Sequence, residues 1–323
     1  MLTPLVLLRH DTRGRAVFSP DGSCFLLAAG PQLVIYSRDG GQVVAAAMPP
    51  HGRLKPFVYG MAWASDGAHV AVAENPTLRL RSAADLAIVA ESDIRMGPIA
   101  FCEGGRALAI GAIDRRLHVL EVPSLVDRGS LGLEVGEHDS FDINHVVADP
   151  AGTLVAATDY GGYSDDDWGH TKERGIPKLT LVDAATPTRS AKELSQPQPI
   201  TDLVLDPWRH RLLVVNYSTI VVRTLDGTFV SEWTPYGRPN VQALAICDRY
   251  VATIPDITWG ASLTLDLWNP TTFQKLATTT LLADTPRQIL LSRAPRFLAA
   301  SPDGSRLVVP EPDGVRLWSV DAG

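Results

Sequence analysis

The pentapeptide Phe-Ser-Pro-Asp-Gly at residues 18–22 recurs near the other end of the chain as Ala-Ser-Pro-Asp-Gly at 300–304, and in degraded form as Trp-Ala-Ser-Asp-Gly at 63–67. Pro, Asp and Gly favour tight turns, because Pro fixes φ, Asp hydrogen-bonds to the backbone that follows it and Gly accepts a positive φ. Weaker copies of the pattern are FCEGG at 101–105, ADPAG at 148–152, LDPWR at 205–209 and ICDR at 246–249. The copies end at residues 22, 67, 105, 152, 209, 249 and 304, so they are 45, 38, 47, 57, 40 and 55 residues apart.

Each turn lies between two short apolar runs, which predicts a β-hairpin rather than a helix. A third run follows in every repeat, and its apolar residues alternate with others, as in a strand with two different faces. Repeats of this length and strand content are typical of the four-stranded blades of a β-propeller, which have about 40–45 residues each. The alternating pairs are Leu33/Ile35, Leu78/Leu80, Leu117/Val119, Leu179/Leu181, Ile220/Val222, Leu265/Leu267 and Val315/Leu317.

Two repeats end in sequences that resemble the WD40 family. Leu-Trp-Asn at 267–269 and Leu-Trp-Ser at 317–319 are similar to the Leu-Trp-Asp ending of WD40 repeats, and the Ser-Pro-Asp-Gly turns are similar to that family's first hairpin. The resemblance covers the whole chain, but no repeat contains Trp-Asp, and His10 and His138 lie one residue short of the place of the usual Gly-His. It therefore implies an incomplete hydrogen-bond tetrad in the blades, with rigidity supplied mostly by apolar packing.

The expected fold is all-β: a single closed seven-bladed β-propeller with four-stranded antiparallel blades, similar to bacterial WD40-repeat proteins. The last repeat ends after its third strand, whereas an unassigned strand, Thr3–Arg9, precedes the first turn. We expect this N-terminal strand to complete the last blade, because it would cover an open sheet edge. An open solenoid and an eight-bladed ring are the alternatives. The expected blades are about 16–48, 58–93, 96–131, 143–194 with an insertion at 159–177, 200–234, 241–281, and 296–323 together with 3–9.

The expected loops differ in length between the two faces of the ring. Loops after the first and third strands of a blade emerge on one face and are short, whereas loops after the second and fourth strands emerge on the other face. Long loops on a rigid scaffold are common sites of function. We therefore predict that a partner protein or peptide binds the face that carries the loops after the second and fourth strands. The long loops are Pro49–Val58, Gly132–Asn144, Asp159–Pro177, Pro255–Ala261 and Leu282–Pro295.

The largest insertion, Asp159–Pro177, combines aromatic and acidic side chains. Aromatic residues beside charges suit a binding hot spot, because they offer a large contact area at little cost in rotamer entropy. Arginines on this face would add a mixed-charge rim that steers a protein partner. A solvated loop packed on its own blade and a cation site are the alternatives for the insertion. The predicted partner-binding residues are Tyr160, Tyr163, Asp165, Asp166, Asp167, Trp168, Trp259, Arg53, Arg116 and Arg287.

The segment Glu137–His145 has the His, Asp and Glu content that metal sites share, but His145 begins a predicted strand. We therefore expect its histidines to be structural, with no metal bound. The cysteines cannot all pair and show no Cys-x-x-Cys spacing, which predicts small buried side chains in a reducing compartment. They are Cys24, Cys102 and Cys247.

Composition limits the classes of partner. A net charge of −7 argues against sequence-independent binding of nucleic acid, which needs a positive surface. No apolar run has the length of a membrane span, and the N-terminus lacks the pattern of a secretory signal, so we expect a cytoplasmic protein without a membrane partner. Arg outnumbers Lys by 24 to 5, which is typical of a GC-rich genome and favours a bacterial source.

No catalytic motif is present in the sequence: there is no phosphate-binding Gly loop, GxSxG elbow, HExxH or Cys nucleophile signature. The leading hypothesis is a non-catalytic protein-interaction scaffold without cofactors. The alternatives are a propeller-type lactonase or hydrolase with its site at the channel mouth, and a propeller subunit of a bacterial defence or signalling complex.

Overall fold

The regular structure of the chain is almost entirely β-strand. In the computed structural model the only helical element among the described residues is η1, a 3-10 turn at Glu103–Gly105. No helix in this part of the chain has the length and hydropathy needed to cross a membrane. The structure describes residues 2–8, 15–49, 58–74, 76–94, 97–133, 143–150, 152–158, 178–188, 190–196, 198–237, 239–256, 262–282, 297–311 and 314–321.

The described strands form seven four-stranded antiparallel sheets. Six sheets consist of four strands that follow one another in the chain, and the remaining sheet has the order β1-β28-β27-β26. The first three sheets contain β2 (Arg15–Phe18), β3 (Cys24–Ala29), β4 (Gln32–Ser37) and β5 (Gln42–Ala47); β6 (Val58–Trp63), β7 (His69–Glu74), β8 (Leu78–Ser82) and β9 (Ile88–Ser92); and β10 (Ile99–Cys102), β11 (Ala107–Gly111), β12 (Arg116–Glu121) and β13 (Asp127–Gly132).

The next three sheets have the same plan. They contain β14 (Ile143–Ala148), β15 (Thr153–Thr158), β16 (Lys178–Asp183) and β17 (Ser190–Ser195); β18 (Asp202–Asp206), β19 (Arg211–Asn216), β20 (Thr219–Thr224) and β21 (Phe229–Trp233); and β22 (Val241–Ile246), β23 (Val251–Pro255), β24 (Leu263–Trp268) and β25 (Lys275–Leu282). The remaining sheet contains β1 (Leu2–Leu8), β26 (Ala299–Ala300), β27 (Arg306–Glu311) and β28 (Gly314–Val320).

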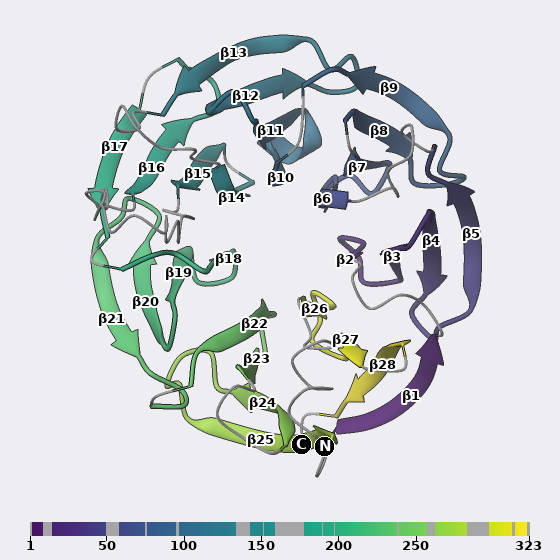
Figure 1. The fold of residues 1–323 in the computed structure, drawn as a ribbon, viewed down its shortest axis with the longest axis vertical. Helices are drawn as coiled ribbons and strands as arrows, with labels where there is room; N and C mark the ends of the chain where they lie inside the picture. Colours follow the sequence, from purple (N-terminus) through teal and green to yellow (C-terminus); the bar gives the residue numbers. More distant parts are fainter. Residues whose placement is uncertain are drawn as a thin grey trace, which may run out of the picture.

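The sheets are arranged radially around a central axis (Figure 1). The innermost strands β2, β6, β10, β14, β18, β22 and β26 each contact the innermost strand of the next sheet, and β26 contacts β2. The predicted all-β class, the β-propeller fold and the four-stranded antiparallel blades are therefore confirmed.

The first strand of the chain lies in the same sheet as the last three. β1 pairs antiparallel with β28, with Leu2 opposite Val320 and Leu8 opposite Val315. The register shifts after Pro4, a residue that has no N–H to donate to the ladder. β1 is the outermost strand of its sheet, and the two chain ends lie side by side at the rim in Figure 1.

The core consists of apolar clusters that each lie between two neighbouring sheets. Strand β4 shows how alternation serves two clusters at once. Leu33 and Ile35 pack against the sheet of β6–β9, whereas Val34 and Tyr36 pack against the sheet that contains β28. Full burial of such a side chain contributes about 1.5–3 kcal/mol. β4, the third strand of its sheet, therefore helps to join this sheet to the sheets on both sides of it.

The repeated turns have the same hydrogen bonds. Ser19 Oγ donates to Asp21 Oδ1 at 2.6 Å, and Ser301 Oγ donates to Asp303 at 2.7 Å. The glycine N–H of each turn donates to the serine carbonyl at 2.9 Å, and Gly22 has a φ of 69°. Glycine adopts this left-handed conformation without steric cost, which explains why the repeat keeps it.

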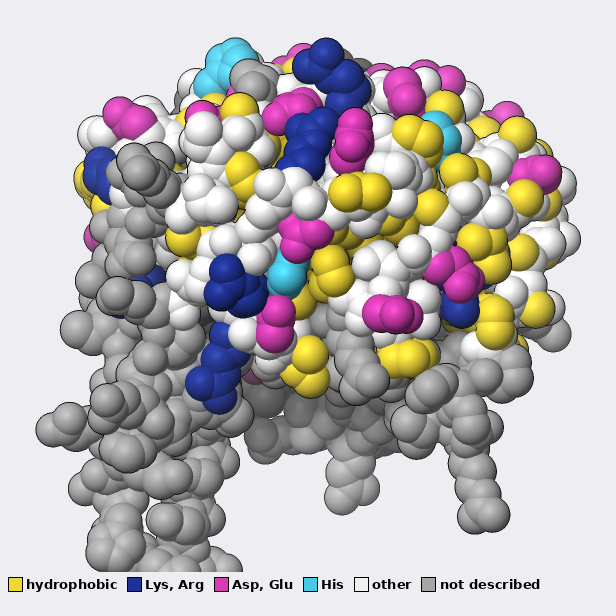
Figure 2. All heavy atoms as spheres, turned by 90° about the horizontal axis from the view of Figure 1, so that it is seen from above, with side chains coloured by type: hydrophobic (Ala, Val, Ile, Leu, Met, Phe, Trp, Pro, Cys, Tyr) yellow, Lys and Arg dark blue, Asp and Glu magenta, His cyan; other side chains and the backbone are white. Residues whose placement is uncertain are grey.

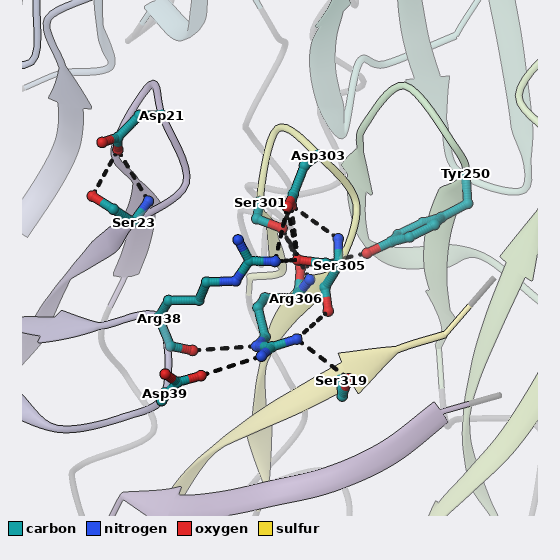
Figure 3. Close-up of polar contacts among 10 residues, drawn as sticks. All are labelled: Asp21, Ser23, Arg38, Asp39, Tyr250, Ser301, Asp303, Ser305, Arg306 and Ser319. Carbon is teal, nitrogen blue, oxygen red and sulfur yellow. Dashed lines mark hydrogen bonds and ion pairs between the residues drawn. The ribbon is translucent and has the colours of Figure 1, made fainter.

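Ion pairs join the turns of the last sheet to those of the first sheet (Figure 3). Arg38, which follows β4, donates to Asp303 Oδ2 at 2.9 Å. Arg306 of β27 reaches in the opposite direction, with its guanidinium 3.2 Å from Asp39 Oδ1 and 3.3 Å from the Arg38 carbonyl oxygen. The last and first sheets, which share an apolar cluster, are thus also joined by their turns.

We expect the Asp303 carboxylate to stabilise the fold in a pH-dependent way. Partial burial opposes ionisation, but hydrogen bonds from Ser301 and Ser305 and the charge of Arg38 lower the pKa of Asp303 from 3.8 to about 2. A carboxyl group whose pKa is lower in the folded protein than in the unfolded chain stabilises the folded protein at any pH above its pKa in the unfolded chain. This stabilisation is lost as the pH falls through its pKa in the folded protein. Asp303→Asn should therefore lower the Tm at pH 7 by about 2–4 °C, and the difference should shrink towards pH 3.

Asp39→Asn is the matched control for this measurement, because Asp39 pairs with Arg306 at the same junction but its side chain is 81% exposed. It should change the Tm little at any pH. A Tm difference for Asp303→Asn that stays constant from pH 7 to pH 3 would contradict the assigned role.

The cysteines are free thiols. Cys102 and Cys247 are buried as predicted, and burial raises the pKa of Cys102 to about 12. The prediction is wrong for Cys24, which is half-buried because it begins β3 directly beside the exposed turn at Ser23.

Candidate functional site

The two faces of the ring differ in the length of their connections. First and third strands of each sheet run in the same direction, so connections after second and fourth strands lie together on one face, here called the long-connection face. These connections include residues 48–57, 133–142, 159–177 and 283–298, as the strand bounds show. On the opposite face no connection between described strands is longer than 184–189 or 269–274. The asymmetry predicted from the sequence is therefore present.

A cavity of about 370 Å³ lies where the central channel meets the long-connection face. Innermost strands begin at this face, and because the sheets converge at the axis, their first residues surround the cavity. Gly60, Ile99 and Leu298 contribute apolar or backbone surface. The polar lining consists of Arg15, Asn144, His145, Thr201, Asp202 and Gln242.

The opposite end of the channel has a different character. A second cavity, of about 320 Å³, is lined mainly by apolar residues from the far ends of the same strands, such as Trp63, Phe101 and Val147. Polar and charged side chains are therefore concentrated at the long-connection end, which makes this end the better candidate for recognition of a polar ligand.

β-Bulges accompany two of the polar side chains. Asn144 in β14 and Gln242 in β22 are each the extra residue at a shift in strand register. A bulge bends its strand and re-aims a side chain, and bulges are frequent beside functional sites. The two amides thus line the cavity at positions where the regular ladder is interrupted.

Three ionisable side chains from different sheets meet in this cavity. His145 Nδ1 lies 3.7 Å from Asp202 Oδ1, and Asp202 Oδ1 also accepts a hydrogen bond from the Leu203 N–H at 2.8 Å. Burial lowers the pKa of His145 below its usual 6.5, although Asp202 opposes the shift, and the charge of Arg15 acts in the same direction as burial. His145 is therefore neutral at pH 7.

Surrounding protein also lowers the pKa of Arg15 by desolvation, although its side chain is accessible to solvent, and the nearby charge of Asp202 opposes this shift. The guanidinium stays protonated at any physiological pH, because its ordinary pKa is above 12. Arg15 is therefore a permanent cation at the channel mouth, and its side chain remains accessible to solvent.

Of the predicted partner-binding residues, the structure describes Arg116. This residue begins β12 on the long-connection face, where its Nε donates to Ser130 Oγ at 2.8 Å and its guanidinium also donates to the Ser130 carbonyl at 3.1 Å. Its side chain thus lies against its own sheet and does not line the axial cavity. The other predicted residues lie outside the described part of the chain: Tyr160, Tyr163, Asp165, Asp166, Asp167, Trp168, Trp259, Arg53 and Arg287.

Sequence reasoning missed the polar end of the channel. Arg15 and Asp202 were not singled out, and His145 was expected to have a structural role. One signal was available, since Arg15 and Asp202 begin the first strand of their repeats and His145 is the third residue of its own. In a ring of repeats, the first strands of all repeats lie around the central axis, so polar residues near their starts are expected to lie close together.

Another polar cluster on this face surrounds His118 of β12. Its Nε2 lies 2.9 Å from Asp114 Oδ2 and its Nδ1 lies 2.8 Å from Asp127 Oδ2. Both ring nitrogens therefore have a carboxylate partner, and the cluster joins the turn before β12 to β13. Within the described segments, no group of three or more His, Cys, Asp or Glu side chains is arranged to hold a metal ion.

Comparison with known proteins identifies the fold. No protein-family model matches the chain, and no curated protein matches it. A solved structure does match: the β-propeller domain of Cps50 (Swd1) from Myceliophteria thermophila covers 99% of this chain and 100% of its own, with a TM-score of 0.73. The chain has a β-propeller fold. The sequences are 14% identical, so the similarity to this β-propeller domain extends to the fold alone.

Proposed function

We propose that this β-propeller is a non-catalytic interaction scaffold that binds a partner protein or peptide on its long-connection face. The observation that carries the proposal is the difference between the faces: the longest segments between described strands all join strand ends on one of them. A rigid framework that presents long segments on one side is a common arrangement for recognition.

The packing of the ring supports binding by a preformed surface. Apolar clusters fill each space between neighbouring sheets, so the strand ends on the long-connection face are held in fixed positions. A partner that docks there would require little rearrangement of the framework.

The outer rim is a weaker candidate for the docking surface. Figure 2 views the ring edge-on and shows hydrophobic side chains scattered among acidic and basic ones. Scattered apolar residues are normal on protein surfaces, whereas docking sites have contiguous patches. The exposed apolar side chains of the outer strands include Val43, Ile88, Val89, Phe229, Val230 and Leu276.

Removing two tryptophans from the long connections tests the proposal. The double variant Trp168→Ala/Trp259→Ala should capture at least about ten-fold less of the native partner, because truncated aromatic hot spots typically cost 2 kcal/mol or more. The measurement is affinity purification from the native host with quantitative mass spectrometry. The Tm should stay within about 2 °C of wild type.

Trp208→Ala is the matched control, because Trp208 is a 39% exposed tryptophan in the turn between β18 and β19, on the opposite face. This variant should capture the partner as wild type does. Equal capture by the double variant, or a loss confined to Trp208→Ala, would refute docking on the long-connection face.

A hydrolase with its site at the channel mouth is the second candidate, and one observation favours it. His145 is neutral at pH 7 and lies beside Asp202, and both are residue types of general-base catalysis. The distance of 3.7 Å between His145 Nδ1 and Asp202 Oδ1 is longer than a hydrogen bond that would orient the imidazole. We therefore rank this function below the scaffold.

A further inference from the structure

The axial cavity has the size and lining of a site for a small polar group. Its volume of about 370 Å³ falls in the range of ligand pockets, and it is surrounded by strand residues of the rigid framework. The docking proposal rests on Trp168 and Trp259, which the argument for the cavity does not use. Failure of either proposal therefore leaves the other standing.

Arg15 is the cavity's permanent cation. A guanidinium offers a planar fork of N–H donors that matches the two oxygens of a carboxylate. Among the described residues the charge that acts on Arg15 is that of Asp202. Asp202 Oδ1 already accepts the Leu203 N–H and lies close to His145. The negative charge of Asp202 is thus shared among several partners, and the Arg15 guanidinium can still pair with the anion of a ligand.

We propose that this cavity binds a carboxylate, which pairs with the Arg15 guanidinium while the side-chain amides of Asn144 and Gln242 line the same space. The carboxylate belongs either to a small organic acid or to an acidic side chain of a peptide, and both present the same chemistry to Arg15.

The charges of the cavity favour a monoanionic group over a phosphate. One guanidinium balances one negative charge, and the carboxylate of Asp202 in the same cavity repels a second charge on the ligand. The remaining lining is neutral at pH 7: two amides, the Thr201 hydroxyl and the His145 imidazole. Because these groups are neutral, a carboxylate bound beside Arg15 leaves no further charge in the cavity without a partner.

Titration of purified protein with defined probes tests the site. The free acids are the monoanions butyrate and D-gluconate, and the peptide is acetyl-Gly-Glu-Gly-amide, whose only carboxylate is the glutamate side chain. Acetyl-Gly-Gln-Gly-amide serves as the uncharged match. Binding is measured by saturation-transfer NMR and isothermal titration at low salt, and circular dichroism verifies that each variant is folded.

The two charged residues should have opposite effects on the affinity. Arg15→Gln should weaken carboxylate binding by at least about ten-fold, because a charge-assisted bidentate pair is lost. Asp202→Asn should strengthen it several-fold, because a like charge is removed. Arg106→Gln is the matched control: it removes one positive charge from the turn before β11, on the opposite face, and should change nothing.

Saturable binding of a free acid with these opposite effects supports a small-acid site. The same pattern with the glutamate peptide alone supports a site for an acidic side chain. The proposal is overturned if no probe saturates, if Arg15→Gln binds as wild type does, or if Asp202→Asn weakens binding. The Asp202→Asn result stays decisive if Arg15→Gln does not fold, because its expected sign is a gain.

Discussion

Deletion of residues 1–10 should cause aggregation, or lower the Tm by on the order of 10 °C or more. The deletion removes β1 and leaves β28 without its outer partner along the register from Val315 to Val320. It also removes Leu8 from the apolar cluster shared by the sheets of β2–β5 and β26–β28. An uncovered edge with apolar neighbours invites pairing between chains. Soluble yield, size-exclusion chromatography and thermal unfolding measure the effect.

Leu5→Ser is the matched control for the deletion. Leu5 belongs to β1 but its side chain is 42% exposed, so the variant keeps the strand while changing its surface. It should unfold as wild type does. A synthetic peptide of residues 1–10, added during refolding, should restore part of the lost stability. A truncated protein with unchanged Tm and no aggregation would show that β28 does not require β1.

Gly97→Ala should lower the stability by at least about 3 kcal/mol, which corresponds to a fall in Tm on the order of 5–10 °C. Gly97 lies between β9 and β10, and a Cβ added there would lie 1.4 Å from the carbonyl oxygen of Gly111 in β11. Gly111 itself lies close to the next sheet, since a Cβ at its position would lie 2.5 Å from Ile143 Cγ2. The obstacle is therefore the backbone of Gly111, in the same sheet as β10, rather than a flexible side chain.

Gly132→Ala is the control for this substitution. Gly132 ends β13, and the nearest atom to an added Cβ is a flexible arginine nitrogen of Arg116 at 3.5 Å. The change should alter stability by no more than about 0.5 kcal/mol. Thermal and denaturant unfolding of both variants decide the matter: equal stabilities would refute the close approach of the backbones at Gly97.

The fold class was predictable because its signals are local. A turn such as residues 18–22 depends on residues next to one another, and the alternation of Leu33 and Ile35 with Val34 and Tyr36 depends on the period of a strand. The structure confirms the β-propeller and its four-stranded antiparallel sheets. The half-buried position of Cys24 was missed, because its burial depends on how close the strand begins to an exposed turn.

The candidate site was much less predictable. Of the residues proposed from loop composition, Arg116 is described, and it bonds to its own sheet rather than to the cavity. Arg15, His145 and Asp202 carry no motif and stand in three different repeats. Nothing in the sequence around any one of them indicates that the others lie nearby.

By itself, the sequence determined the repeat unit, the turns and the alternation of each strand, because these depend on residues that are close in the chain. Tertiary structure alone decided which polar side chains meet, because the sheets converge at the axis only when the whole ring is assembled. Bulges at Asn144 and Gln242 then altered which side chains line the cavity, and partial burial lowered the pKa of His145. Burial and long-range charge act through space, so the chemistry of the channel mouth depends on the folded ring.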